Sequence, residues 1–458
     1  MKKLLALVLA ALMILGASSV LAESGKNIPE LTKDPMTILL WDIATEGVGK
    51  KAQEDAVARF MADYPNIKVE QVHKQNDTYK QDLQIGFSAK EGQPDMYIHW
   101  GGGPMAEYYK SGCVNDITEL FNTYDHPDFI DAAVAQSTFD GKILAIPFGG
   151  LSGCDIFYNK AIFDELGIEV PQTIAELEAA CDKIKEAGYY PFSLANLPRW
   201  TGSMYYMYLV ARHSGNAEFD AAYDGTGSFT SPAFIYAGEK IQEWVNKGYF
   251  NEGFNSMAPD NNDDRALLIQ GAAAMMLHGS WQVAGIKNDD EEFYNDNLGV
   301  FRFPVDEEAQ AAGVPQNVEI GTAIGNGFSF NCWLDAEHTQ VDEEKLKACY
   351  VLATQYYNDD TYNAIQVEGV NTPSIKGYEN VDDPNNKVVI DVFFGASNVQ
   401  LWYDQYLPAS VTEVHKDMMG ALFGLEKTPE EVGQAQDAAM SVHSSLLESS
   451  LSPFSRAD

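Results

Sequence analysis

Positive charge and cysteine are both scarce in this sequence. Its 458 residues include 30 Lys and Arg against 67 Asp and Glu, a formal net charge of −37. A field of that sign repels phosphate backbones and anionic lipid headgroups, so neither nucleic acid nor a membrane surface is an expected partner. The five cysteines include no C-x-x-C pair, which argues against zinc and thioredoxin-type motifs. At most two disulfides could form, and their pairing stays open.

Several catalytic signatures are missing too. There is no H-E-x-x-H motif and no nucleotide-binding P-loop, and the eight histidines lack metal-ligand spacing, so we expect neither a metal nor another cofactor. Residues 150–154 lack the last glycine of a nucleophile elbow. A glycoside hydrolase needs only two carboxylates, and Asp42 and Glu46 near a predicted strand end form a candidate pair. An exported glycoside hydrolase therefore remains the alternative hypothesis.

The amino terminus has the pattern of a signal peptide. Lys2 and Lys3 precede an apolar run at 4–15, and Val20-Leu21-Ala22 offers small residues for cleavage before Glu23. We therefore interpret residues 1–22 as a signal peptide. No later run is long and apolar enough for a transmembrane helix. The expected location is the periplasm or the extracellular face of the cell membrane.

A strand–helix alternation opens the mature chain. Apolar strands are predicted at 37–41, 67–72 and 96–100, and helical stripes at 50–63 and 78–89 separate them. This order with short connections is typical of a parallel α/β sheet, in which ligands lie at the carboxyl ends of strands. Residues 164 to about 298 are mostly helical in pattern, most clearly at 182–187, 232–247 and 263–270. Strands are predicted at 272–277 and 300–303, a strand pair at about 320–330, and further helices at 342–357 and 429–448.

The positions of the tryptophans carry the strongest chemical signal. Trp244 shares a helical stripe with Ile241 and is expected in the core, whereas Trp333 is ambiguous. The other five lie at strand ends or in loops, beside small or polar residues: Trp41, Trp100, Trp200, Trp281 and Trp402. An indole face stacks on the C–H face of a sugar ring while neighbouring polar groups hydrogen-bond its hydroxyls. Five such residues favour a carbohydrate-binding surface.

The order and spacing of several segments resemble a known family. The chain resembles the extracellular solute-binding proteins of ABC-type sugar importers, of the maltose- and oligosaccharide-binding kind (solute-binding protein family 1). The resemblance covers nearly the whole mature chain. Its segments are Y-P-N-I-K-V at 64–69, G-Q-P-D at 92–95, G-K-I-L-A-I-P at 141–147, F-Y-N-K at 157–160, F-D-E-L-G-I at 163–168, G-A-A-A-M with G-S-W at 271–281, and T-P-E-E at 428–431.

This resemblance implies a two-lobed periplasmic-binding-protein fold of type II. Each lobe would be a mainly parallel sheet flanked by helices, with a ligand cleft between the lobes. The expected amino-terminal lobe is discontinuous and comprises 36–147 and 304–345. The expected carboxy-terminal lobe comprises 148–303 and 346–458.

The resemblance also implies a function and a set of ligand contacts. The protein would be an exported, non-enzymatic receptor that captures a neutral mono- or oligosaccharide and delivers it to ABC permease subunits with their ATPase. We expect it to act as a monomer. Two departures are the absence of the family's lipid-anchoring cysteine and a serine at 152, where some members carry an acidic residue. The contacts carried over by position are Glu46, His99, Trp100, Ser152, Asn196, Trp200, Trp281, Trp402 and Asp404.

Overall fold

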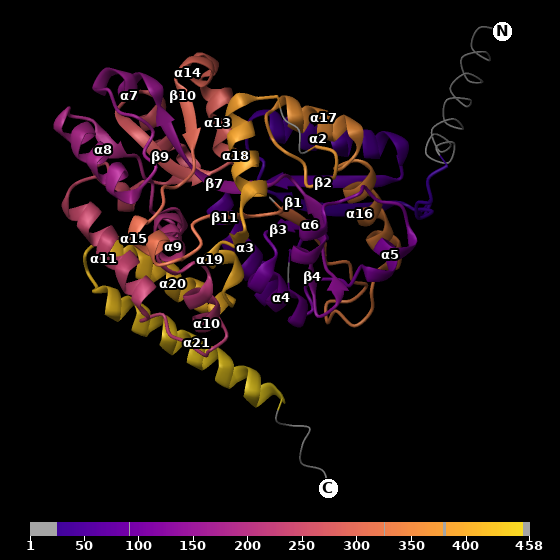
Figure 1. The fold of residues 1–458 in the computed structure, drawn as a ribbon. Coiled ribbons are helices and arrows are strands. Elements are labelled where there is room, and N and C mark those ends of the chain that lie inside the picture. Colours follow the sequence, from indigo (N-terminus) through magenta and orange to yellow (C-terminus); the bar gives the residue numbers. More distant parts are fainter. Residues whose placement is uncertain (1–24, 91, 325, 379–381, 452–458) are drawn as a thin grey trace. The chain divides into compact units, whose positions relative to one another are not determined.

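The computed structural model describes residues 25–90, 92–324, 326–378 and 382–451 (Figure 1). The predicted signal peptide at 1–22 lies outside these residues. Within the described part of the chain, no helix has the length and apolar character needed to cross a bilayer. The chain divides into two compact units: unit 1 comprises 1–101, 105–150 and 324–378, and unit 2 comprises 102–104, 151–323 and 379–458.

The five-stranded sheet of unit 1 contains the three strands predicted first. β1 (Met36–Asp42) pairs in parallel with β2 (Ile67–His73) on one side and β3 (Met96–His99) on the other. β12 (Asn326–Phe330) and β6 (Ile146–Phe148) complete the order β2-β1-β3-β12-β6, and both of their pairings are antiparallel. The carboxyl ends of β1 and β3 therefore lie at one edge of this sheet.

Helices cover this sheet because their apolar faces need burial. In α2 (Gly47–Asp63), Ala52, Ala56 and Phe60 recur at four-residue spacing and are all buried. α16 (Glu343–Gln355) and α17 (Asp360–Glu368) both contact α2 (Figure 1). The other elements of unit 1 are α3 (Asn76–Ala89), α4 (Gly102–Lys110), α5 (Thr118–Thr123), α6 (Asp131–Gln136) and the two-stranded pair β4 (Thr138–Phe139) and β5 (Lys142–Ile143).

Unit 2 contains a six-stranded sheet. Its order is β13 (Asn398–Gln400), β11 (Val318–Thr322), β7 (Ser152–Asn159), β9 (Ala273–Gly279) and β8 (Tyr190–Phe192), and β10 (Leu298–Phe301) pairs with β7 outside this path. The β13–β11 and β8–β9 pairs are parallel, whereas β7 is antiparallel to all three of its partners. The α/β class is as expected, but both sheets are mixed rather than mainly parallel. Strands that enter a sheet from a crossing segment are not held to the parallel direction that a β-α-β crossover imposes.

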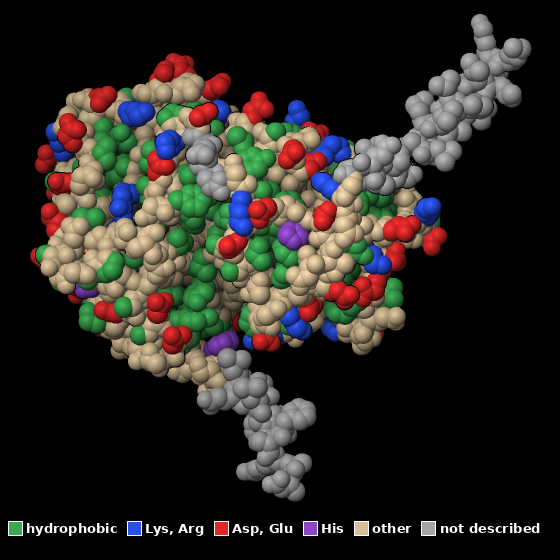
Figure 2. Space-filling model, turned by 45° about the vertical axis from the view of Figure 1, so that its right-hand side comes forward, with side chains coloured by type: hydrophobic (Ala, Val, Ile, Leu, Met, Phe, Trp, Pro, Cys, Tyr) green, Lys and Arg blue, Asp and Glu red, His purple; other side chains and the backbone are tan. Residues whose placement is uncertain are grey.

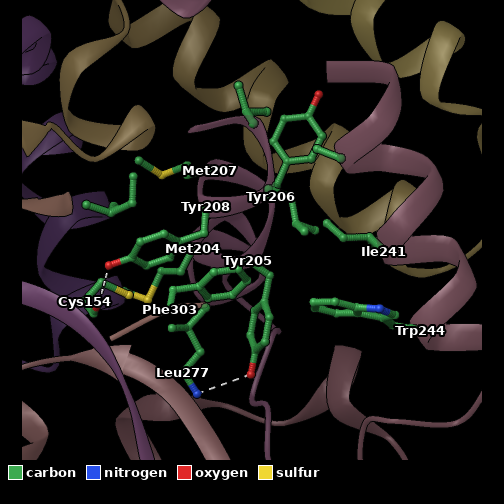
Figure 3. Close-up of a cluster of buried hydrophobic side chains, with 14 of the residues drawn as sticks. Cys154, Met204, Tyr205, Tyr206, Met207, Tyr208, Ile241, Trp244, Leu277 and Phe303 are labelled. Atoms are coloured by element: carbon green, nitrogen blue, oxygen red, sulfur yellow. Dashed lines mark hydrogen bonds between the residues drawn. The ribbon is translucent and has the colours of Figure 1, made fainter. Parts of the chain in front are cut away.

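The central helix of unit 2 is α9 (Trp200–Ser214), which lies in the stretch predicted to be mostly helical but was not predicted individually. Twelve of its fifteen residues are buried, so it shows no polar face and no readable periodicity. The Tyr208 hydroxyl donates to the carbonyl of Cys154 on β7, and the Tyr205 hydroxyl accepts from the amide of Leu277 on β9 at 3.3 Å (Figure 3). These bonds fix α9 to the two central strands. Trp244 is 1% exposed in the same core, as predicted.

Further helices surround this core. α8 (Ile174–Glu186) begins eight residues before the predicted helix at 182–187, because Thr173 and Glu176 form a reciprocal capping box at its start. The remaining helices are α7 (Lys160–Leu166), α10 (Ala217–Tyr223), α11 (Pro232–Asn246), α12 (Asp263–Ile269), α13 (Trp281–Asp289), α14 (Glu291–Asp296), α15 (Glu307–Ala311), α18 (Pro384–Gly395), α19 (Tyr403–Tyr406), α20 (Ala409–Phe423), α21 (Pro429–Leu451) and the short 3₁₀ turns η2 (Phe254–Ser256) and η3 (Pro259–Asn261).

Two of the three predicted unit boundaries differ from those in the structure. The chain leaves unit 1 after 150, close to the expected 147, but it returns after 323 rather than 303 and leaves again after 378 rather than 345. The predicted strand pair at 320–330 is the reason for the first difference. Its first strand, β11, pairs with β7 and β13 in unit 2, whereas its second strand, β12, pairs with β3 and β6 in unit 1. The second difference arises because α16 packs on β1 and β12.

Two buried carboxyl groups face each other on β7 and β11. The register pairs Gly153 with Gly321, and two residues further along it sets Asp155 opposite Glu319. Both side chains are at most 1% exposed, and their carboxyl oxygens have no hydrogen-bond partner among the described residues. Burial raises the pKa of Asp155 to about 7, against the opposing effect of the Arg302 and Arg212 cations. Burial and the neighbouring Asp155 raise the pKa of Glu319 well above its ordinary value.

We expect Asp155→Asn to change how stability depends on pH. The native Asp155 keeps its proton up to about pH 7, whereas the unfolded chain releases it near pH 4. The native state therefore binds more protons between these values, and stability falls as the pH rises through them, by about 1.4 kcal/mol per pH unit for one proton. Urea unfolding at pH 5, 6, 7 and 8 should show that the free energy of unfolding of the variant increases relative to that of the wild-type protein as the pH rises.

Asp296→Asn, on the exposed end of α14, is the matched control. Its free energy of unfolding should follow that of the wild-type protein across the same pH range. Parallel stability curves for Asp155→Asn and the wild-type protein would show that Asp155 does not titrate in this range.

Candidate functional site

Three tryptophans from separate segments of unit 2 lie together, and two of them contact one histidine. Trp200 begins α9, Trp281 begins α13, and Trp402 directly precedes α19. The Trp281 ring centroid lies 6.2 Å from that of Trp200 and 6.0 Å from that of Trp402. The His278 ring centroid lies 5.4 Å from that of Trp200 and 5.3 Å from that of Trp281. Trp281 is 40% exposed, although Trp402 is only 7% exposed. The group therefore presents one open indole supported by buried or half-buried rings.

The residues before Trp281 explain how its ring is placed. A Cβ atom at Gly279 would lie 2.1 Å from the Trp281 ring, so only glycine lets the indole fold back over the end of β9. Ser280 is held at two points, because its amide donates to the Gly153 carbonyl at 2.8 Å and its hydroxyl to the Leu151 carbonyl at 3.3 Å. The backbone beneath the indole is thus attached to the start of β7.

His278 is the polar centre of this group, and the sequence analysis did not select it. Its Nδ1 accepts from the Gly279 amide at 2.9 Å, which leaves the proton on Nε2, 3.6 Å from the Asp264 carboxylate. Burial lowers the pKa of His278 to about 3, so the ring is neutral at physiological pH. The only sequence signal for it is a single polar residue in the otherwise apolar strand β9. Gln282 is buried as well, and its side chain accepts from Arg265 at 3.2 Å.

Trp200 lies at a strained point of the backbone. Arg199 precedes it with φ of 69°, a left-handed conformation that is uncommon for a residue other than glycine. The Trp200 Nε1 atom is buried and has no acceptor among the described residues. Buried donors without partners are rare and costly, and they are found most often where function requires them.

Asn196 supports Trp200 from inside the protein. It is fully buried, its Oδ1 accepts from the Gly202 amide at 2.8 Å, and its Nδ2 donates to Asn255 at 2.7 Å. The first bond occupies one of the free amides in the first turn of α9. Asn196 was selected as a ligand contact, but its polar atoms are used within unit 2, so its role here is to position the start of α9.

The other two predicted contacts in unit 2 lie close to these segments. Asp404 is half-buried, two residues after Trp402, and its Oδ2 accepts from Gln405 at 2.8 Å. Ser152 begins β7, is 7% exposed, and pairs with Thr322 on β11. Their assignment as ligand contacts remains a prediction.

In unit 1, the predicted tryptophans are paired with lysines. Trp100 follows β3, packs edge-on against Tyr79 at 6.1 Å, and has the Lys80 ammonium 4.4 Å from its ring centroid. Trp41, near the end of β1, has the Lys74 ammonium 3.9 Å from its ring. A cation over an indole is an attractive contact that also occupies the ring face. A lysine ammonium therefore covers one face of each of these two indoles, whereas Trp281 is 40% exposed.

His99 was also selected as a ligand contact, but both of its ring nitrogens are used inside unit 1. Nδ1 accepts from the Gly101 amide at 2.8 Å, so Nε2 carries the proton and donates to the Ser329 hydroxyl at 2.6 Å. Ser329 in turn donates to the Leu144 carbonyl at 2.6 Å. Burial lowers the pKa of His99 to about 3. This chain of bonds joins β3 and β12, so His99 holds the strand end rather than offering a free nitrogen.

The two carboxylates of the candidate hydrolase pair differ in burial, because Asp42 lies inside the protein and Glu46 lies on its surface. Asp42 is fully buried and accepts three hydrogen bonds, from His73 at 2.7 Å, Gln71 at 2.8 Å and the Ala44 amide at 2.9 Å. Glu46 is exposed at the start of α2. Asp42 is enclosed by three internal donors, so its carboxylate is not available to act with Glu46 as a pair on a substrate.

The family model for bacterial extracellular solute-binding proteins matches residues 44–329. The chain belongs to this family. The matched segment includes every predicted site residue except Trp402 and Asp404, and it contains His278 and Trp281 together with the strands that support them. Solute-binding proteins of this family are a substrate-binding class rather than an enzyme class.

Individual relatives of this solute-binding protein are distant in sequence. The multiple sugar-binding protein of Streptococcus mutans is 30% identical over 238 residues, 50% of this chain and 52% of the relative. The maltotriose-binding protein of Pyrococcus abyssi is 24% identical, over 51% of this chain and 47% of the relative. The matches thus span about half the length of these curated relatives.

Solved structures match over much more of the chain. One is described under xylan utilization by the thermophilic bacterium Caldanaerobius polysaccharolyticus, with a TM-score of 0.77, 25% identity, and coverage of 88% of this chain and 99% of that one. A chitin oligosaccharide binding protein has a TM-score of 0.78 at 23% identity and covers 90% of this chain and 100% of that one. These likenesses agree with the α/β fold of two units described above.

Proposed function

We propose that this protein is the substrate-binding component of an ABC transporter and that it captures a sugar or oligosaccharide for delivery to a membrane permease. The observation that carries the proposal is the group of three indoles, two of which contact His278, with Trp281 40% exposed, in a chain of the solute-binding family. The names of relatives, multiple sugar-binding and maltotriose-binding, support a carbohydrate as the ligand class.

The arrangement can hold a sugar through two kinds of contact. The open face of Trp281 would stack on the C–H face of a sugar ring, and Trp200 and Trp402 keep that indole from turning away. The half-buried carboxylate of Asp404, beside Trp402, would accept hydrogen bonds from sugar hydroxyls. Stacking and hydrogen bonding suffice for capture and require no bond to break.

We also propose that the protein does not catalyse hydrolysis. Two carboxylates must flank one glycosidic bond for hydrolysis, and the buried, three-bonded Asp42 does not supply one of them. Incubation with candidate oligosaccharides should leave their chain length unchanged. Shorter products that disappear in Glu46→Gln would support the hydrolase instead.

The ligand is proposed to be neutral, and the protein to be an exported monomer. Figure 2 shows Asp and Glu side chains dispersed over the face drawn, which agrees with the net charge of −37. A diffuse negative field disfavours anionic ligands, although physiological salt screens it within about 8 Å. Comparing a sugar with its carboxylate derivative measures this preference, and light scattering measures the oligomeric state.

A thermal-shift screen against mono- and oligosaccharides tests the proposal. A ligand that binds only the native state raises its stability by mass action, by about 2.7 kcal/mol at 100 times the dissociation constant. Xylo-, malto- and chito-oligosaccharides are the first set, with amino acids and short peptides as the control set. A rise in Tm with peptides and none with any sugar would contradict the proposal.

A further inference from the structure

Two of the five cysteines face each other inside unit 1. The Sγ atoms of Cys332 and Cys349 lie 3.8 Å apart, and both side chains are fully buried. Cys332 follows β12 and Cys349 lies on α16, so the two sulfurs lie between the end of a strand and a helix. All five cysteines are free thiols in the structure, and all five are buried. The other three are Cys113, Cys154 and Cys181.

The backbone around Cys332 is held in place on three sides. Its amide donates to the Asn115 side chain at 2.7 Å, its carbonyl accepts from the Asp342 amide at 3.1 Å, and its Sγ lies 3.5 Å from the Asp95 carbonyl. Cys349 is held by the helical backbone of α16. A disulfide needs an S–S separation of about 2.0 Å, so the two sulfurs must approach from their present 3.8 Å for the bond to form.

A lysine one helical turn before Cys349 adds a charge beside the two sulfurs. The Lys345 ammonium bonds to Asp95 at 2.9 Å and interacts favourably with the thiolate forms of both cysteines. Burial still raises the pKa of the Cys332 thiol well above its ordinary value. Because both thiols are buried, a small disulfide in solution reaches them only while the unit is folding or transiently open.

We propose that Cys332 and Cys349 form a disulfide when the protein folds in an oxidising environment. The location follows from the export that the proposed function requires, but the pairing depends on the geometry alone. The bond would close the base of the loop between β12 and α16, which contains the stacked pair Trp333 and His338 at 5.2 Å. It would tie α16 to the end of β12 in the sheet of unit 1.

The reaction is exchange with a low-molecular-weight disulfide. The thiolate of one cysteine attacks a sulfur of that disulfide, a mixed disulfide forms, and one small thiolate leaves. The second cysteine thiolate then attacks the protein sulfur of the mixed disulfide and expels the second small thiolate. The protein loses two electrons and two protons, and the small disulfide is reduced to two thiols.

The test is refolding of the full chain in a glutathione redox buffer. The protein is reduced, unfolded, and refolded with oxidised and reduced glutathione, and its thiols are then alkylated under denaturing conditions. Intact mass should show three alkylated cysteines instead of five. Tryptic mapping should show the peptides 303–345 and 348–376 joined through Cys332 and Cys349. Five alkylated thiols, or two cysteines joined in any other pairing, would overturn the proposal.

Variants separate the bond from general effects of the redox buffer. Closing a loop of this size should raise the Tm of the wild-type protein by about 5 °C, and a reducing agent should remove that gain. Cys332→Ser and Cys349→Ser should each show no response of Tm to the reducing agent. Cys181→Ser, in the core of unit 2, is the control and should respond as the wild-type protein does. Because no sugar is involved, these outcomes are independent of the proposed function.

Discussion

Trp281→Ala should fold with a Tm within a few degrees of the wild-type value and lose about 5- to 150-fold of its sugar affinity. Removing a fully buried tryptophan costs about 3–5 kcal/mol of stability, but Trp281 is 40% exposed and leaves no enclosed cavity. Loss of a stacking face costs about 1–3 kcal/mol of binding. Calorimetric titration of the best ligand from the sugar screen, with the Tm of each ligand-free protein, measures both quantities.

Two further variants make this prediction specific. Gly279→Ala should also weaken binding, because the added methyl group occupies the position of the Trp281 ring and displaces it. Trp333→Ala is the matched control, since this half-buried indole stacks on His338 in unit 1. Trp333→Ala should leave sugar affinity unchanged. Normal affinity in Trp281→Ala, combined with a large fall in Tm, would show that Trp281 is a structural residue.

Arg212→Met should destabilise the protein by about 3–5 kcal/mol. The fully buried guanidinium donates to the carbonyls of Phe303, Pro304 and Val318 at 2.9, 3.0 and 2.6 Å, respectively. Methionine fills a similar space but leaves these three carbonyls without a donor, and each buried unsatisfied group costs about 1–3 kcal/mol. Urea unfolding measures the loss.

The comparison for this prediction is an exposed cation of the same unit. Lys387→Ala removes an ion pair with Asp391 on the surface of α18, and such pairs contribute less than about 1 kcal/mol. Sugar affinity of the folded Arg212→Met protein should stay near the wild-type value, because twelve residues of α9, about 18 Å, separate position 212 from Trp200. An unchanged urea midpoint for Arg212→Met would mean that the three bonds contribute no net stability.

The sequence predicts elements well where burial is one-sided. The strands predicted at 37–41 and 67–72 differ from β1 and β2 by at most one residue at each end. Their limits could be predicted because the apolar residues either alternate with polar ones or form a run that stops at a clear turn residue. Helix α9 was missed because burial on all sides leaves no period to detect. The crossing after 323 was missed because β11 and β12 are adjacent in sequence yet belong to different sheets.

The candidate site was predicted in its aromatic part and missed in its polar part. Trp200, Trp281 and Trp402 come together as a group, and the signal in the sequence was their position at strand ends or in loops, beside small or polar residues. His99 and Asn196 were carried over by position from the family resemblance, which does not reveal that their polar atoms bond inside the protein. His278 gave no motif, since one histidine in an apolar strand resembles a core residue.

The discontinuity of unit 2 has a consequence for biosynthesis. Strand β13 and Trp402 are both supplied by residues after 379, whereas β7, β9 and most of the core are complete by residue 323. A nascent or truncated chain that ends before residue 398 would therefore leave β11 as an unpaired edge of the sheet and would lack the third indole of the group. Unpaired edges favour association between chains. Residues 398–402 thus act as a late closing segment, because neither the finished sheet nor the complete indole group can form before they are synthesised.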